Sequence, residues 1–333
     1  MENAVVSNSE SEQAVQDRLD QQAKRKEKIA KVLPFAGLIF IFLFFLGITG
    51  GKIISPSNIE NLINQAFAIT IIAVGAAFVY AHGGMDFSLG AAAGVAQLVG
   101  ALLITKTGAP LWVSILACIL TGVACSAIVG GASILFKVPV FIASLCMRTI
   151  CMGILATVVS SSEIIVPFNE YKFINNASVK AVVAVIVIAI GVYLFEYTRI
   201  GKYEKAIGGN SSTAAQAGVR TDNIKFLAYI FLGVCVGIAS VFMMFRSSTV
   251  NAQSGSGMEF NTMIAIVLGG FPMTGGDTAR IRSTIIGAIT ITLLTNGLII
   301  WGLDPNLVNG LKGVLFLVIV GLSYDRSKGK LVS

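Results

Sequence analysis

Long apolar runs separated by short polar segments fill this chain from residue 32 to residue 323. A transmembrane helix needs about 20 predominantly apolar residues, and only helices and closed barrels can cross lipid. The runs are too continuous for the alternating strands of a membrane barrel. The pattern therefore predicts an all-α membrane protein with about ten transmembrane helices, at 33–50, 59–81, 87–105, 111–135, 140–159, 179–197, 224–245, 259–271, 281–300 and 307–322.

Composition agrees with this prediction. Charged residues make up 12% of the chain and hydrophobic residues 55%, whereas a soluble domain carries about 25% charged residues. Twelve of the charged residues lie in the first 31 positions, so the remainder is still poorer in charge. We therefore expect a polar tail at 1–31, a transmembrane domain at 32–323 and a second polar tail at 324–333.

Lysine and arginine are distributed unevenly between the two ends of the predicted spans. Ten spans place both termini on one side of the membrane. If that side is the cytosol, the inner segments hold 17 basic residues and the outer loops hold five, Lys52, Lys106, Lys172, Lys180 and Arg246. Because cytoplasmic segments carry the excess of basic residues, we expect both termini in the cytosol. The net charge of +7 then reflects orientation and gives no reason to expect nucleic acid as a partner.

The chain offers little material for catalysis or metal binding. It has one histidine, His82, and its five cysteines lie inside predicted spans without metal-ligand spacing. The segment GITGGKI at 47–53 lacks the GxxxxGK[ST] spacing of a phosphate-binding loop. We therefore expect no catalytic residue, no metal and no cofactor. Secondary carriers often carry paired ionisable residues inside the membrane, and only Arg148 is plainly buried in a span here, so that class is weakly supported.

A polar segment at 198–225 lies between the sixth and seventh predicted spans. Gly208, Gly209 and Asn210 interrupt any continuing helix, and Asn210, Ser211 or Ser212 can cap a new one. Gly218 is a C-terminal stop signal. The segment therefore predicts a short helix of small residues across the cytosolic face, or an ordinary interfacial connector.

Two further features sit at or inside the spans. In the turn between spans two and three, Gly83 and Gly84 permit unusual backbone angles and Asp86 can cap the third helix; a role in an inner gate is the alternative. Arg148 lies eight residues into span five, about 12 Å along a helix. A lone arginine there costs about 2.5–3.5 kcal/mol to insert, so it requires a pore, a partner or a structural ion pair.

Four segments of the chain resemble one family in the same order. The permease subunits of carbohydrate-type ABC importers, such as the ribose, xylose and galactose permeases, carry the pattern TRxGrxxxAxGgNxxAAxxxGv, which TRIGKYEKAIGGNSSTAAQAGV at 198–219 resembles. The segment GGMDFSLGA at 83–91 is similar to the family's GGxDLSvG. The segments 246–276 and 306–326 resemble its glycine-rich segment and its closing span. The resemblance covers nearly everything after the first tail.

The resemblance implies that transport chemistry is divided between several subunits. It implies two permease subunits, as a homo- or heterodimer, that form the path through a bacterial inner membrane. It further implies an extracellular or periplasmic solute-binding protein and a separate cytosolic ATPase that supplies the energy. In this family the polar segment is the coupling helix that enters the ATPase, and the matching positions are Gly201, Ala206, Gly208, Asn210, Ala214, Ala215 and Gly218.

A hydroxyl-rich solute is held by amides and carboxylates, and such residues lie near the outer span ends: Asn64, Gln65, Glu259, Asn261 and Asn296. For each residue alone, an interhelical hydrogen bond worth about 0.6 kcal/mol is the simpler interpretation. After Gly275 and Gly276 the chain departs from the family pattern with DTARIRSTIIGA, which contains Arg280 and Arg282. The substrate subgroup therefore stays open. Branched-chain amino acids or nucleosides are alternatives, as are a secondary carrier and a purely structural membrane scaffold.

Overall fold

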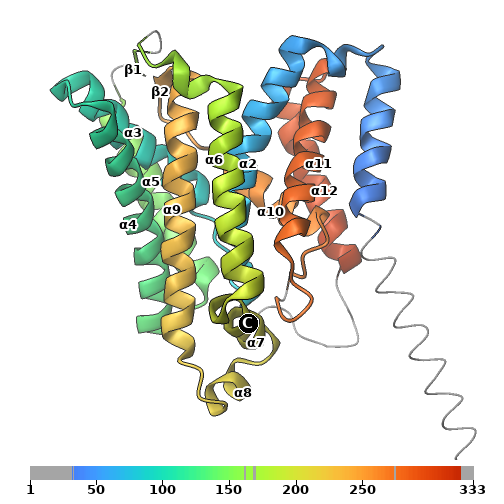
Figure 1. The fold of residues 1–333 in the computed structure, drawn as a ribbon. Coiled ribbons are helices and arrows are strands. Elements are labelled where there is room, and N and C mark those ends of the chain that lie inside the picture. Colours follow the sequence, from blue (N-terminus) through green and yellow to red (C-terminus); the bar gives the residue numbers. More distant parts are fainter. Residues whose placement is uncertain (1–31, 33, 161–162, 168–169, 274, 324–333) are drawn as a thin grey trace, which may run out of the picture.

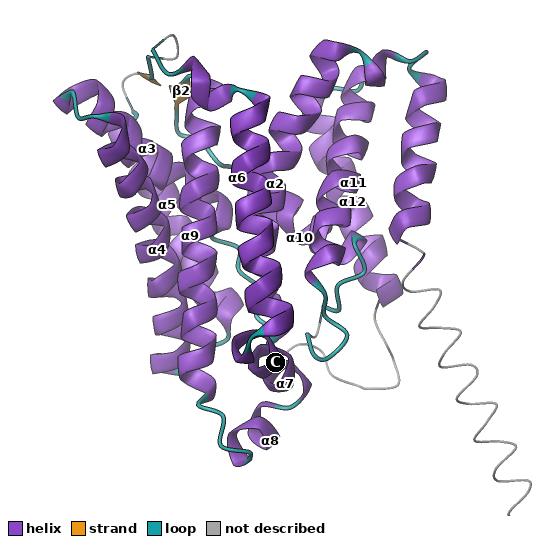
Figure 2. Cartoon of the chain, in the orientation of Figure 1, coloured by secondary structure: helices purple, strands orange, loops and turns teal. Residues whose placement is uncertain are grey.

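The apolar runs of the sequence form long helices, which make up nearly all of the fold (Figures 1 and 2). The computed structural model describes residues 32, 34–160, 163–167, 170–273 and 275–323. The tails 1–31 and 324–333, expected to be polar and cytosolic, lie outside these described residues. All-α is therefore the fold class of the described chain, apart from two strands of two residues each.

Within the described residues, seven helices are long and apolar enough to cross a membrane: α2 (Pro56–Ala81), α3 (Leu89–Thr107), α4 (Leu111–Phe136), α5 (Val140–Val158), α6 (Ala177–Val192) with the π-helical turn η3 (Tyr193–Tyr197), α9 (Thr221–Ser247) and α11 (Ile281–Ile300). Three shorter apolar helices are Pro34–Ile48, α10 (Met258–Leu268) and Pro305–Val318, the last within α12 (Pro305–Ser323). All ten apolar segments of the sequence are thus helical. Seven of them meet the length of a span, and the ten-span topology stays a prediction.

The centre of the bundle is the packing of α2 against α9. Almost every residue in the second half of α2 is buried, and Phe78 contacts both Phe195 and Phe231, with ring centroids 5.1 and 4.7 Å apart. On its other side α9 packs against α4. A Cβ atom added to Gly122 of α4 would lie 2.5 Å from the carbonyl oxygen of Gly233 of α9, a close backbone approach that small residues permit between membrane helices.

The two ends of the bundle are different. At one end β1 (Ile164–Ile165) pairs antiparallel with β2 (Thr249–Val250), with Ile164 opposite Val250. The short 3₁₀ helices are η1 (Lys52–Ile54) and η2 (Lys172–Asn175). At the opposite end α7 (Arg199–Gly209) and α8 (Ser211–Gln216) connect α6 to α9, and α8 extends furthest from the bundle (Figure 1). We call these the strand end and the α8 end.

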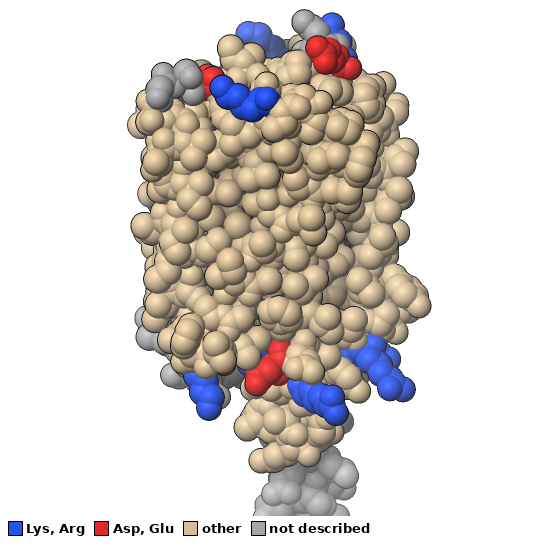
Figure 3. Space-filling model, turned by 90° about the vertical axis from the view of Figure 1, so that its left-hand side faces the viewer, with Lys and Arg blue, Asp and Glu red and all other residues tan. Residues whose placement is uncertain are grey.

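The side of the molecule that carries α4 shows an uncharged band between its two ends (Figure 3). Lysine, arginine, aspartate and glutamate gather above and below the band and are absent from its middle on this face. Large apolar side chains of α4, among them Trp112, Leu116 and Leu120, are exposed there. A band of this kind can be solvated by lipid, which is the environment that a multi-pass membrane protein requires.

Candidate functional site

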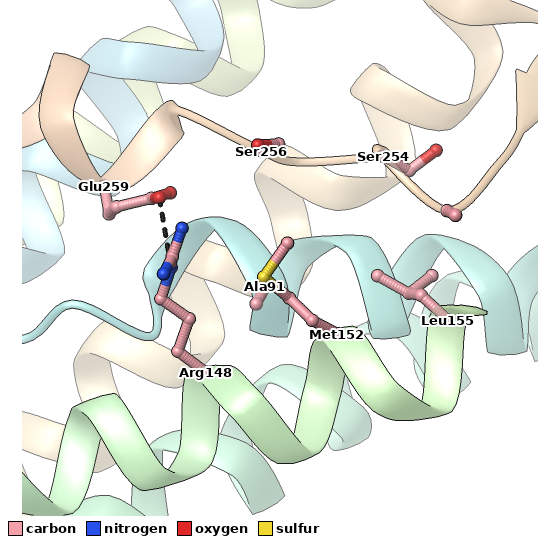
Figure 4. Close-up of a pocket in the computed structure, with 8 residues that line it drawn as sticks. Ala91, Arg148, Met152, Leu155, Ser254, Ser256 and Glu259 are labelled. Atoms are coloured by element: carbon pink, nitrogen blue, oxygen red, sulfur yellow. Dashed lines mark ion pairs between the residues drawn. The ribbon is translucent and has the colours of Figure 1, made fainter. Parts of the chain in front are cut away.

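Arg148 of α5 points toward Glu259 in the first turn of α10, and its Nε atom lies 3.4 Å from Glu259 Oε1 (Figure 4). The Arg148 side chain is 33% exposed, whereas that of Glu259 is 2% exposed. Arg148, which the sequence placed alone inside a predicted span, therefore has an acidic partner on another helix. A small pocket opens beside this ion pair and is lined by Ala91, Arg148, Met152, Leu155, Ala252, Ser254, Ser256 and Glu259.

A close backbone contact positions Glu259. The loop 251–257 lies on α3, where Gly90 and Gly94 are one turn apart on one helix face. A Cβ atom at Gly90 would come within 2.2 Å of Glu259 Oε2, and one at Gly94 within 2.2 Å of the Ser254 carbonyl oxygen. Only glycine therefore allows this approach. Sequence analysis missed both residues as site residues, although the GAAAG spacing is a known signal for close helix packing.

The surface of α5 around Arg148 is open on one side. Ser144, Met147, Cys151 and Leu155 form the buried stripe of this helix, whereas Cys146, Thr149 and Gly153 on the opposite stripe are exposed. Arg148 lies at the border between the two stripes. An exposed cation in the middle of an apolar helix is costly against lipid, so this stripe requires water or another protein surface beside it.

The polar residues predicted near the outer span ends lie on α2, α10 and α11. Asn296 of α11 and Asn58 of α2 exchange hydrogen bonds of 2.9 Å through their side-chain amides. Asn64 of α2 accepts a hydrogen bond from Lys180 of α6, and the Lys180 side chain also donates to Asn175. These amides therefore join helices, the simpler of the two sequence interpretations. Lys180, counted as an outer-loop residue from the sequence, is buried in α6.

Gln65 and Asn261 have different surroundings from the amides that join helices. Both are half-buried. Within the described part of the chain, the side-chain oxygen of Asn261 is buried without a hydrogen-bond partner. Asn261 lies two residues after Glu259 in α10, and Asn64 and Gln65 are adjacent in the first half of α2.

The loop after α2 holds Gly83 at a φ of +86°, a conformation that favours glycine. Asp86 is 1% exposed, and its Oδ1 atom accepts hydrogen bonds of 2.7 Å from the Ser88 amide and 2.6 Å from the Ser88 hydroxyl. Ser88, and not Asp86, is the residue before the first turn of α3. The predicted cap is therefore wrong in position, because Asp86 forms a local turn two residues before Ser88. Gly84 is buried beside it.

Titratable side chains at the α8 end form three further pairs. His82 Nδ1 lies 2.6 Å from Glu204 Oε2 of α7, and both side chains are almost fully buried. Lys205 Nζ lies 2.8 Å from Glu196 Oε2 of η3, and Arg280 NH1 lies 3.5 Å from the same oxygen. Arg282 is exposed. Sequence analysis treated His82 only as an isolated histidine, since nothing in its spacing indicates a partner 122 residues away.

The polar segment forms two helices, α7 and α8, where one was predicted. Asn210 caps α8 as expected, since its Oδ1 atom accepts hydrogen bonds from the Ser212 and Thr213 amides at 3.0 and 3.1 Å. Gly218, at a φ of +85°, ends it, with Gly218 N bonded to the Ala215 carbonyl and Val219 N to that of Ala214. This is the two-bond Schellman ending.

The seven predicted coupling residues fall into two groups. Asn210, Ala214, Ala215 and Gly218 belong to α8 and its two ends, and of these only Ala214 is buried. Gly201, Ala206 and Gly208 belong to α7. Gly201 packs on the backbone of Phe195, and Gly208 packs on that of Ala81, whereas Ala206 is exposed. The exposed members of the predicted set therefore lie mainly on α8 and at its two ends.

Comparisons with known proteins agree on one family. Residues 58–320 match the family described as branched-chain amino acid transport system / permease component. The ribose import permease protein RbsC of Bacillus subtilis (strain 168) is 30% identical over 308 residues, which cover 90% of this chain and 93% of that protein. The protein of the same name in Escherichia coli (strain K12) is 28% identical over 275 residues, 79% of this chain and 84% of that protein.

A third relative, the galactofuranose transporter permease protein YtfT of Escherichia coli (strain K12), is 26% identical over 275 residues. These cover 80% of this chain and 79% of that protein. No solved structure matches the chain.

Proposed function

This chain belongs to the branched-chain amino acid transport system / permease component family, and from that premise we propose that it is the permease subunit of an ABC importer for a carbohydrate. The substrate class rests on relatives named for ribose and galactofuranose import. The chain is a multi-pass membrane protein and a transport subunit, not an enzyme. Hydrolysis of ATP is assigned to a separate cytosolic subunit, and the membrane is the bacterial inner membrane.

The observation that carries the proposal is the extent of the match. It spans residues 58–320, which include nearly all of α2 and every element from α3 to α11. The loop 251–257 beside Arg148 lies within this range. Ligand delivery is assigned to a solute-binding protein at the strand end, and energy transfer to the ATPase at the α8 end. A second permease subunit completes the path, with the open stripe of α5 beside Arg148 facing it.

Two features of the site fit a neutral, hydroxyl-rich solute. Arg148 and Glu259 form a pair of opposite charge, so the pocket beside them has little net charge to attract an ion. Ser254 and Ser256 add hydroxyl groups to its lining. Hydroxyl and charged groups together can exchange hydrogen bonds with a sugar as it passes.

Uptake into proteoliposomes tests the proposal. The permease, its co-purified ATPase and its binding protein are reconstituted with ATP inside, and entry of radiolabelled D-ribose, D-galactose and L-leucine is measured. We expect uptake of a sugar only when all three proteins and ATP are present. Sugar uptake without the ATPase would make the chain a secondary carrier. Uptake of leucine alone would move it to the amino-acid branch of its family.

A further inference from the structure

The helix α7 lies between α8 and the helices of the bundle (Figure 1). Asn210 is the only residue between α7 and α8, and it also caps α8 through its side chain. The elements that contact α7 include α2, η3 and α9, besides α8 itself. The helix α8 also contacts α9, so α7 is one of two routes by which a displacement of α8 reaches the bundle.

A buried, hydrogen-bonded side-chain pair fastens α7 to the end of α2. His82 directly follows α2, and its Nδ1 atom is 2.6 Å from Glu204 Oε2, with the two side chains 3% and 0% exposed. Within the described residues, His82 Nε2 and Glu204 Oε1 have no hydrogen-bond partner. Each side chain therefore has the other as its hydrogen-bond partner, and exchanging one of them removes that hydrogen bond.

Close packing supports the same junction. A Cβ atom at Gly208 would lie 2.0 Å from the Ala81 carbonyl oxygen, and the Gly276 amide donates a 3.0 Å hydrogen bond to that oxygen. The last residue of α2 thus holds both α7 and the loop before α11. Lys205 and Arg280 share Glu196 nearby, which links α7, η3 and the same loop.

The junction is also connected to the Arg148 site. The loop that follows His82 reaches α5, where the Phe87 amide donates a 3.1 Å hydrogen bond to Ser144 Oγ. Ser144 is four residues before Arg148, so the two lie on neighbouring turns of one helix face. A continuous set of contacts therefore leads from α8 through α7, His82 and Phe87 to Arg148.

We propose that His82 and Glu204 are positioning residues that transmit movement of α8 to the loop 82–88 and so to the Arg148–Glu259 site. The proposal rests on the proposed function, in which α8 contacts an ATPase. It assigns α7 the part of a rigid connector, held by the His82–Glu204 and Lys205–Glu196 pairs and by close glycine contacts. Coupling of this kind predicts a measurable response at the far site.

The response can be measured without knowing the transported solute. In a background without the five native cysteines, Ser256 beside the Arg148 site is exchanged for cysteine, and its rate of maleimide labelling is followed in the complex with the ATPase. The rate is compared with and without ATP and orthovanadate, which trap the ATPase. The variants are His82→Gln, Glu204→Gln and the swapped pair His82→Glu with Glu204→His. Lys202→Gln, on the exposed face of α7, is the matched control.

We expect trapping to change the labelling rate at least fivefold in the parent protein and in Lys202→Gln. In His82→Gln and Glu204→Gln the ATPase should still bind and be trapped, but the labelling rate should change less than twofold on trapping. The swapped pair should restore at least half of the parental change in labelling rate. A parental response in both single variants would overturn the inference and leave the proposed function intact. A stable swapped pair without any response would overturn it as well. A parent protein that neither binds the ATPase nor responds would contradict the proposed function itself.

Discussion

Arg148 and Glu259 form an ion pair between α5 and the first turn of α10, with Nε and Oε1 3.4 Å apart. The acidic partner is buried and the basic partner is partly open to the pocket. Their charges come from elements separated by more than 100 residues in the sequence. The pair therefore joins two parts of the chain at the candidate path and leaves one face of the guanidinium free.

The pair predicts non-additive effects of substitution. Removing one member of a buried pair costs about 3–5 kcal/mol because the other charge is left without compensation. We expect Arg148→Met and Glu259→Gln each to lower thermal stability in detergent, and the double variant to recover at least half of the loss. Ile150→Leu, on an exposed position of α5, is the control and should not change stability.

Uptake measurements distinguish a role of Arg148 in the path from a role in a structural ion pair. If the residue also lines the path, the double variant should recover stability but keep an uptake rate at least tenfold below the parent protein. Recovery of both stability and uptake would assign Arg148 to a structural ion pair alone.

Labelling of single cysteines tests the orientation. We expect cysteines that replace Ser212 or Ser327, in a protein without native cysteines, to react only from the cytosolic side, because basic residues gather at that end. One that replaces Ser178 should react only from outside. Ser212 and Ser178 are both exposed, in α8 and in the first turn of α6. Reaction of Ser212→Cys with an impermeant maleimide on intact cells would reverse the topology.

A charged substitution on the exposed surface of α8 should weaken binding of the ATPase. Ala215 is exposed on α8, and Ala215→Asp adds bulk and charge where a partner must approach closely. Co-purification of the ATPase should fall at least tenfold, while the permease remains in the membrane at normal abundance. Ala177→Asp, exposed at the other end of the molecule, is the control. Unchanged binding by Ala215→Asp would return the segment to an interfacial connector.

Removing the cap of α8 should have a graded effect. Replacing an N-cap asparagine with alanine costs about 1 kcal/mol of helix stability, and α8 has only six residues. Asn210→Ala should therefore weaken ATPase binding by about fivefold, the factor that 1 kcal/mol corresponds to. Asn210→Ser, which keeps a capping oxygen, should bind the ATPase like the parent protein. Equal weakening by both variants would show that the cap is not the cause.

Stability at the α8 end should depend on pH. Burial raises the pKa of the Glu204 carboxyl, whereas His82 and Lys225 act in the opposite direction. The folded protein then binds this proton more tightly than the unfolded chain does. The resulting stability is fully present below the unfolded pKa and is lost as pH rises through the folded pKa.

Glu204→Gln removes this titration and keeps an oxygen that can accept a hydrogen bond from His82. Between pH 4.5 and pH 8 we expect the unfolding temperature of the parent protein to fall relative to that of Glu204→Gln. Glu170→Gln, at an exposed residue, should follow the parent protein. Parallel curves for the parent protein and Glu204→Gln would contradict the assignment.

Local signals in the sequence were sufficient for the helices and for the ends of α8. Long apolar runs predicted every apolar helix of the described residues, and Asn210 and Gly218 predicted where α8 begins and ends, because caps depend on neighbouring residues. The partners of Arg148, His82 and Asn296 could not be predicted in the same way. Each lies on another element, so its position depends on how the helices pack and not on local spacing. The start of α3 was predicted at Asp86, two residues before its position at Ser88. The cause is local, since aspartate also forms turns that precede a helix.

The shortness of α10 has a consequence for dynamics. Its 11 residues rise about 16 Å, roughly half of a hydrocarbon core, and the loops on either side complete its path with irregular backbone. Such backbone has fewer internal hydrogen bonds to break than a continuous helix, so it opens at lower free energy. Amide hydrogen exchange should therefore be faster in residues 251–257 than in the buried half of α2. Because this loop directly precedes α10, its opening would free the first turn of that helix, where Glu259 pairs with Arg148.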